Sequence, residues 1–148
     1  MRLFAIAFVL SFLGCVPREQ RRGFTDACRY WVNLDGAQTV EASRLAGFVK
    51  VFLNVDGIEY LLEKMNSKLP NESQVATVLL MLNYEVLIQT DTDESRRLMQ
   101  MIKRSSFMDK AREYSISACN SAIQESLEMF LVRVGIDREG EPTHLDSE

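Results

Sequence analysis

The sequence predicts an all-α fold: a compact bundle of five or six helices with a long C-terminal helix. Apolar residues recur at spacings of three and four along most of the chain, whereas the alternation typical of strands is scarce. The 148 residues suffice for one globular domain. The composition, 47% hydrophobic and 26% charged with only three prolines, is that of an ordinary folded protein.

We expect four segments: a signal peptide over residues 1–15, a flexible leader over 16–23, a single helical domain over 24–135 and a disordered acidic tail over 136–148. The signal peptide is indicated by Arg2 and by the apolar run that follows it, which is about half the ~20 residues that a membrane span needs. The small residue Gly14 and Cys15 end the run. We therefore expect a secreted, extracellular protein without a membrane span.

Residues 12–15 allow a second interpretation. Phe-Leu-Gly-Cys resembles the lipobox of bacterial lipoproteins, in which the cysteine becomes the lipidated first residue. The resemblance covers four residues, and Phe12 stands where the motif usually has leucine. It implies a surface lipoprotein anchored through Cys15.

The first helix of the domain is expected to begin near residue 25 and to end before residue 35. Phe24, Cys28 and Trp31 follow one another at steps of four and three, which places them on one apolar face. The alternative to a signal peptide is a hydrophobic N-terminal helix packed into the fold, but nothing downstream continues its apolar periodicity across Pro17.

The second helix is expected over residues 39–54. Its last part, residues 48–55, is rich in β-branched and aromatic residues and could form a strand, but a lone strand in a helical chain has no partner for its backbone groups. Asp56 and Glu59 have the spacing of a capping box at the start of a third helix, which extends to about Lys68.

Residues 75–88 include eleven apolar residues in fourteen. This stretch is too short to cross a membrane, so it predicts a central helix around which the others pack. Pro70 separates it from the third helix, because the residue before a proline avoids helical angles.

Asp91 and Glu94 have capping-box spacing at the start of a fifth helix, which ends near Arg104. The longest element is expected to run without interruption from Phe107 to about Val134. Its apolar stripe, at steps of three and four, consists of Ile116, Cys119, Ile123, Leu127, Phe130 and Val134.

Cys28 and Cys119 are predicted to form a disulfide. Both lie on the apolar faces of expected helices, and export places them in a compartment that tolerates such bonds. Closing a loop of about ninety residues contributes roughly 4 to 5 kcal/mol by restricting the unfolded chain. The alternative is a pair of buried, unpaired cysteines.

Asn71 begins an acceptor sequon, Asn-Glu-Ser, in an expected loop after Pro70. The sequon predicts N-glycosylation of Asn71 if the producer is a eukaryote.

Few residues are suited to catalysis or metal binding. The single histidine, His144, lies in the tail, so we expect neither a histidine-assisted nucleophile nor a metal site. The acidic cluster Asp91, Asp93 and Glu94 lacks the glycine and later glutamate of a calcium loop, and carboxylates are common at helix starts. The glycines are isolated and form no phosphate-binding loop, so we expect no cofactor. The net charge of −4 is unfavourable for binding nucleic acid, so we expect no nucleic-acid partner.

We therefore predict a small secreted helical protein that binds a protein partner and is not an enzyme. The alternative is a secreted carrier that holds an apolar small molecule or lipid in the bundle core, near residues 48–52 and 75–88.

Overall fold

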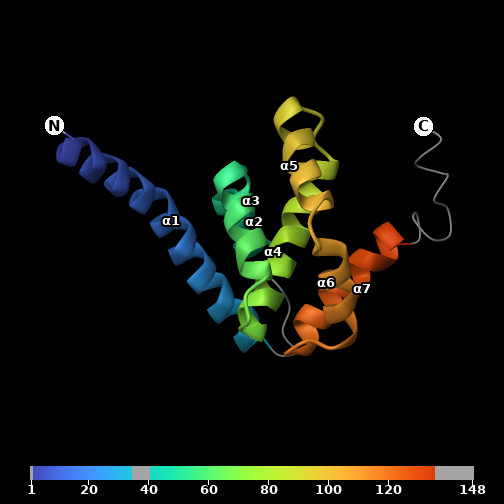
Figure 1. The fold of residues 1–148 in the computed structure, drawn as a ribbon. Helices are drawn as coiled ribbons and strands as arrows, with labels where there is room; N and C mark the ends of the chain where they lie inside the picture. The colour runs from blue at the N-terminus through green and yellow to red at the C-terminus, as the bar shows by residue number, and fades with distance from the viewer. Residues whose placement is uncertain (1, 35–40, 136–148) are drawn as a thin grey trace.

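The computed structural model describes residues 2–34 and 41–135, with side chains placed for 18–34 and 41–134. Within these ranges it contains seven helices and no strand, so the all-α prediction is confirmed, with seven helices instead of five or six (Figure 1). The helices are α1 (Arg2–Asn33), α2 (Ala42–Phe52), α3 (Val55–Met65), α4 (Pro70–Ile88), α5 (Asp93–Lys103), α6 (Phe107–Ile116) and α7 (Ser121–Gly135).

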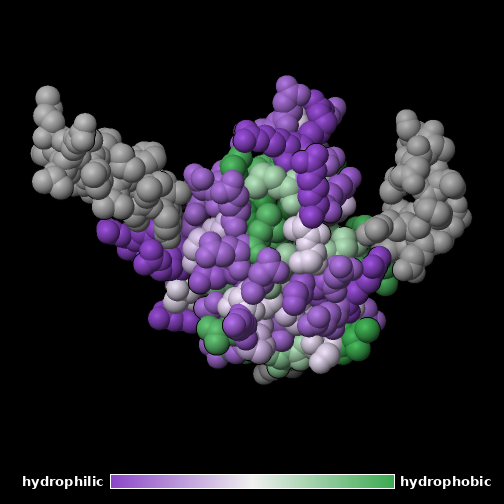
Figure 2. Space-filling model, viewed as in Figure 1, coloured by the Kyte–Doolittle hydropathy of each residue, from purple (hydrophilic) through white to green (hydrophobic). Residues whose placement is uncertain are grey.

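The predicted central helix is confirmed. Helix α4 contacts every other helix of the bundle, and twelve of its nineteen residues are buried. Its apolar side chains point in nearly all directions, so it is stable only when other helices cover it. Hydrophilic residues cover the outer sides of the helices, and hydrophobic residues show in the hollow between α3 and α5 (Figure 2).

Helix α1 begins far earlier than the sequence indicated. It runs unbroken from Arg2 through Pro17, and it includes residues 16–23, which were expected to be a flexible leader. The buried residues Gln20, Phe24, Ala27 and Trp31 follow one another at steps of four, three and four. This face packs on α4, α2 and α3, and the packing favours the helical conformation of residues 20–31.

The predicted long C-terminal helix is wrong. The chain leaves the helical conformation between Ile116 and Ser121 and folds back, so that α6 and α7 pack against each other. Asn120 stabilises the break: its Oδ1 accepts a hydrogen bond from the Ile123 amide at 2.9 Å, and its Nδ2 donates one to the Trp31 carbonyl at 2.6 Å. Ile116, expected to face inward, is 79% exposed.

The helix starts also differ from the expected capping boxes. Asn54 caps α3, because its Oδ1 accepts a hydrogen bond from the Gly57 amide at 2.7 Å. Thr92 and Ser95 form the capping box of α5. Helix α4 starts at Pro70, five residues before the expected position, because proline is well suited to the first turn of a helix.

Buried polar and aromatic contacts tie the outer helices to α4. The Ser73 hydroxyl contacts the Met65 carbonyl and the Tyr114 hydroxyl, both at 2.6 Å, and so joins α3, α4 and α6. Tyr84 lies stacked near Phe107, with ring centroids 5.9 Å apart. No helix in the described part of the chain is both long enough and apolar enough to span a membrane.

Candidate functional site

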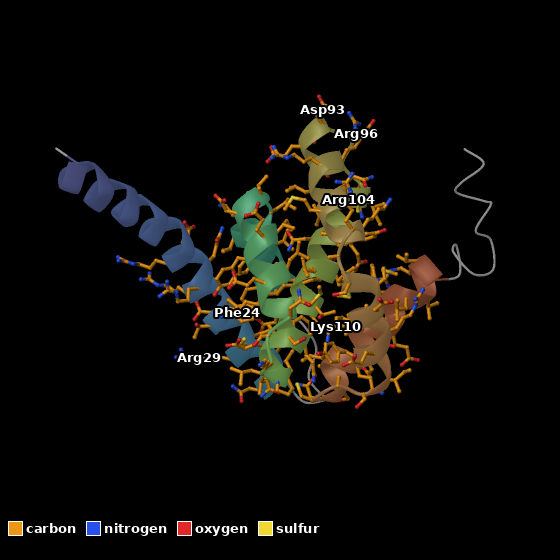
Figure 3. All side chains as sticks on the ribbon, in the orientation of Figure 1. Phe24, Arg29, Asp93, Arg96, Arg104 and Lys110 are labelled. Atoms are coloured by element: carbon orange, nitrogen blue, oxygen red, sulfur yellow. The ribbon has the colours of Figure 1, made fainter. Side chains whose placement is uncertain are left out.

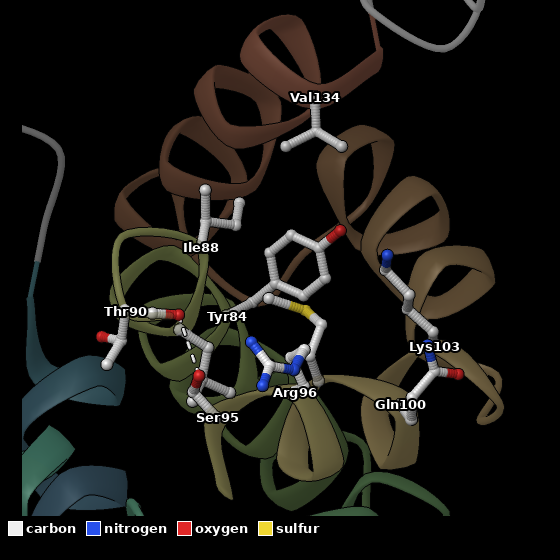
Figure 4. A pocket seen from close by; sticks show the side chains of 10 residues that line it. Tyr84, Ile88, Thr90, Ser95, Arg96, Gln100, Lys103 and Val134 are labelled. Atoms are coloured by element: carbon white, nitrogen blue, oxygen red, sulfur yellow. Dashed lines mark hydrogen bonds between the residues drawn. The ribbon is translucent and has the colours of Figure 1, made fainter. Parts of the chain in front are cut away.

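A pocket of about 540 Å³ lies where the C-terminal ends of α4 and α7 meet α5 (Figure 4). Its volume falls in the range of small-molecule sites. The lining residues are Tyr84, Leu87, Ile88, Thr90, Ser95, Arg96, Met99, Gln100, Lys103 and Val134.

Buried residues form the base of the pocket and exposed polar residues form its rim. Tyr84, Leu87 and Ser95 are each less than 10% exposed. In Figure 4 the Tyr84 ring lies between Lys103 on one side and Ile88 on the other. The pocket therefore offers an apolar interior beside a polar margin.

Two polar interactions add to the core packing that holds the three helices in this arrangement. The Ser95 hydroxyl donates a hydrogen bond to the Thr90 carbonyl at 2.8 Å, which fixes the turn between α4 and α5. An Arg133 nitrogen lies 2.7 Å from a Glu85 carboxylate oxygen, which joins the last turn of α7 to α4. The pocket thus depends on contacts between segments that are distant in sequence.

The pocket is lined by two cations and no carboxylate, although the chain as a whole is acidic. The two cations differ in their surroundings. Arg96 pairs with Asp91 and Asp93 at the tip of α5 (Figure 3). Lys103 is exposed and makes no ion pair with any residue that the structure describes. Of the two cations, Lys103 is therefore the one whose charge no described carboxylate balances.

The predicted disulfide partners lie in one region of the bundle as free thiols. Cys28 is half-buried on α1, but Cys119 is exposed in the connection between α6 and α7, so the prediction that it faces inward is wrong. Asn120, which follows Cys119, hydrogen-bonds to the carbonyl of Trp31, one turn beyond Cys28.

The pKa values of both thiols are raised. Burial is the largest cause for Cys28, whose pKa rises to about 11; the Glu72 carboxylate also raises it, and Lys64 opposes them. The charge on Cys119 also raises the pKa of Cys28. Burial likewise raises the pKa of Cys119. Neither thiol has the lowered pKa that a reactive cysteine needs.

Other residues singled out from the sequence lie apart from the pocket or outside the described part of the chain. Asn71 is exposed, but it lies in the first turn of α4 and not in a loop. The side chain of Cys15 and the whole of His144 fall outside the described residues, as does the predicted acidic tail. Of the acidic cluster, Asp91 and Asp93 are engaged by Arg96.

Sequence reasoning missed the pocket. Its apolar residues come from three helices, where they were assigned to the core, and Lys103 was one of many surface cations. Phe48 and Phe52, near which an apolar ligand was considered, are buried core residues. Across the described residues, no group of three or more acidic, histidine or cysteine side chains could hold a metal ion. No family model, curated protein or solved structure matches the chain.

Proposed function

We propose that the chain is an exported, non-enzymatic protein that binds a protein partner. The observation that carries the proposal is the solvent-facing side of α7, which we call the α7 outer face: Glu125, Glu128, Met129 and Val132. Met129 is 60% exposed and Val132 is 52% exposed. A spacing of three brings these two apolar side chains together on the helix.

The helix that carries the α7 outer face is anchored in the core by its opposite side. The opposite side of α7 places Ile123, Leu127 and Phe130 in the core, all fully buried. Large apolar side chains that are exposed together on a rigid helix are typical of interaction sites. The carboxylates of Glu125 and Glu128 border them, so a matching partner surface would be apolar with a basic margin.

The chemistry of the thiols supports the absence of thiol-based catalysis. Raised pKa values keep Cys28 and Cys119 protonated at neutral pH, and thiols are poor nucleophiles in that form. We further propose that the two thiols join as a disulfide after export. The hydrogen bond from Asn120 to the Trp31 carbonyl supports this pairing, because it holds the residue after Cys119 within one helical turn of Cys28 along α1.

Photo-crosslinking in the native host tests the partner surface. A photoreactive residue at Val132 is expected to give one discrete protein adduct. The same residue at Leu69, which is 60% exposed just before the start of α4, is expected to give none. Excess unlabelled wild-type protein should abolish the adduct.

Two double variants, used as unlabelled competitors in the same experiment, test whether the α7 outer face makes the contact. Met129→Glu/Val132→Glu is expected to compete at least tenfold less well than wild type, because two buried carboxylates would lack partners in the complex. Leu69→Glu/Ile116→Glu carries the same change at two exposed apolar sites elsewhere and should compete fully. Equal competition by both double variants would refute the role of the α7 outer face.

A further inference from the structure

We propose that the pocket between α4, α5 and α7 binds a small amphipathic carboxylate, such as a medium-chain fatty acid. The carboxylate would lie at the rim beside Lys103, and the hydrocarbon would lie along Tyr84 and Leu87. This site is separate from the α7 outer face and does not depend on the proposed protein partner.

The shape and lining of the pocket favour a ligand with an apolar body. Leu87, Ile88, Met99 and Val134 supply aliphatic and thioether surface from three helices. Met99 is partly buried and has a flexible side chain, so it can adapt to ligands of different width. A volume of about 540 Å³ accommodates a chain of roughly ten carbons.

The charge of the lining favours an anionic head group over a neutral or cationic one. Among the lining residues, Arg96 and Lys103 are cationic and none is acidic. Because Asp91 and Asp93 already neutralise Arg96, Lys103 is the group left to pair with an incoming carboxylate. Gln100, one turn before Lys103 on α5, offers amide hydrogens at the same rim.

Calorimetric titration of the full chain with decanoate and with 1-decanol tests the proposal at pH 7 and low salt. The two probes have the same chain length and differ in the charge of the head group. Decanoate is expected to bind at one site about tenfold more tightly than decanol, because a charge-assisted hydrogen bond to Lys103 is worth roughly a factor of ten.

Variants locate the site. Lys103→Gln is expected to weaken decanoate binding about tenfold and to leave decanol unchanged, and Lys103→Arg should retain most of the preference. Lys50→Gln, an exposed lysine on α2 that is remote from the pocket, should bind as wild type does. Ile88→Glu changes a side chain that is 56% exposed, so the fold should survive while both probes bind more weakly.

Three results would overturn the proposal. The first is no saturable binding of either probe, and the second is equal affinity for both probes in the wild type. The third is a preference for decanoate that persists in Lys103→Gln. Circular dichroism on each variant separates a lost site from a lost fold.

Discussion

Oxidised wild-type protein is expected to have a free energy of unfolding about 4 kcal/mol higher than that of the Cys28→Ser/Cys119→Ser variant. A Cys28–Cys119 bond would close a loop of about ninety residues and so restrict the unfolded chain. Urea unfolding of both proteins under the same non-reducing conditions measures the difference. The effect is large because a domain of this size has only about 5–15 kcal/mol of net stability.

The reduced wild-type chain is the internal control, and its stability should fall close to that of the double serine variant. Oxidation before the measurement should be carried out at alkaline pH. The pKa of Cys28, about 11, leaves little thiolate at neutral pH, and thiolate is the form that reacts in disulfide exchange. Equal stability of the oxidised and reduced chains would show that the bond does not form.

Gly57→Ala is expected to destabilise the fold by about 3 kcal/mol, although alanine is the better helix former by about 1 kcal/mol. Gly57 lies in the first turn of α3, where the helix passes close to the end of α2. An added Cβ would lie 2.4 Å from the Phe52 carbonyl oxygen and 2.6 Å from its Cα. Backbone atoms cannot rotate away as a side chain can, so the two helices would have to separate.

Gly47→Ala is the matched control, because this glycine lies inside α2 and an added Cβ would meet no atom within 4 Å. There the usual helix propensity should apply, and we expect the variant to be about 1 kcal/mol more stable than wild type. Thermal unfolding of the two variants under reducing conditions measures both changes in stability, which are expected to be opposite in sign. Stabilisation by Gly57→Ala would contradict the close approach of α3 to Phe52.

The sequence was sufficient to predict the fold class and its central helix. The apolar run over residues 75–88 is hydrophobic on nearly every side, and such a helix must be covered by others. Capping-box spacing gave the approximate starts of α3 and α5, although Asn54 and Thr92 are the residues that cap them. The fold class and the central helix depend on local periodicity, which is the strongest signal in a single sequence.

The break between α6 and α7 could not be predicted from periodicity, because the apolar stripe continues across it. One determinant is the hydrogen bond from Asn120 to Trp31, a residue nearly ninety positions earlier. Likewise, burial of Gln20 and Phe24 against the bundle favours a helix at the end of the segment that was expected to be a flexible leader. Tertiary contacts override local preference at both places.

The pocket is a product of the tertiary arrangement. Tyr84, Lys103 and Val134 come from three helices. Those helices are brought together by core packing such as the contact of the Tyr84 and Phe130 rings, with the Glu85–Arg133 ion pair and the turn before α5 in addition. In the sequence, Lys103 differs in no way from other surface lysines. Its lack of a carboxylate partner among the described residues becomes apparent only in the fold.

Intact-mass spectrometry of the protein from the native host tests most directly whether the chain is exported and cross-linked. The account predicts a mature chain that lacks about the first fifteen residues and is two hydrogens lighter than its reduced form. A glycan at Asn71 would appear as added mass in the same spectrum. A chain that retains Met1, with Cys28 and Cys119 both titratable as thiols after denaturation, would contradict the account.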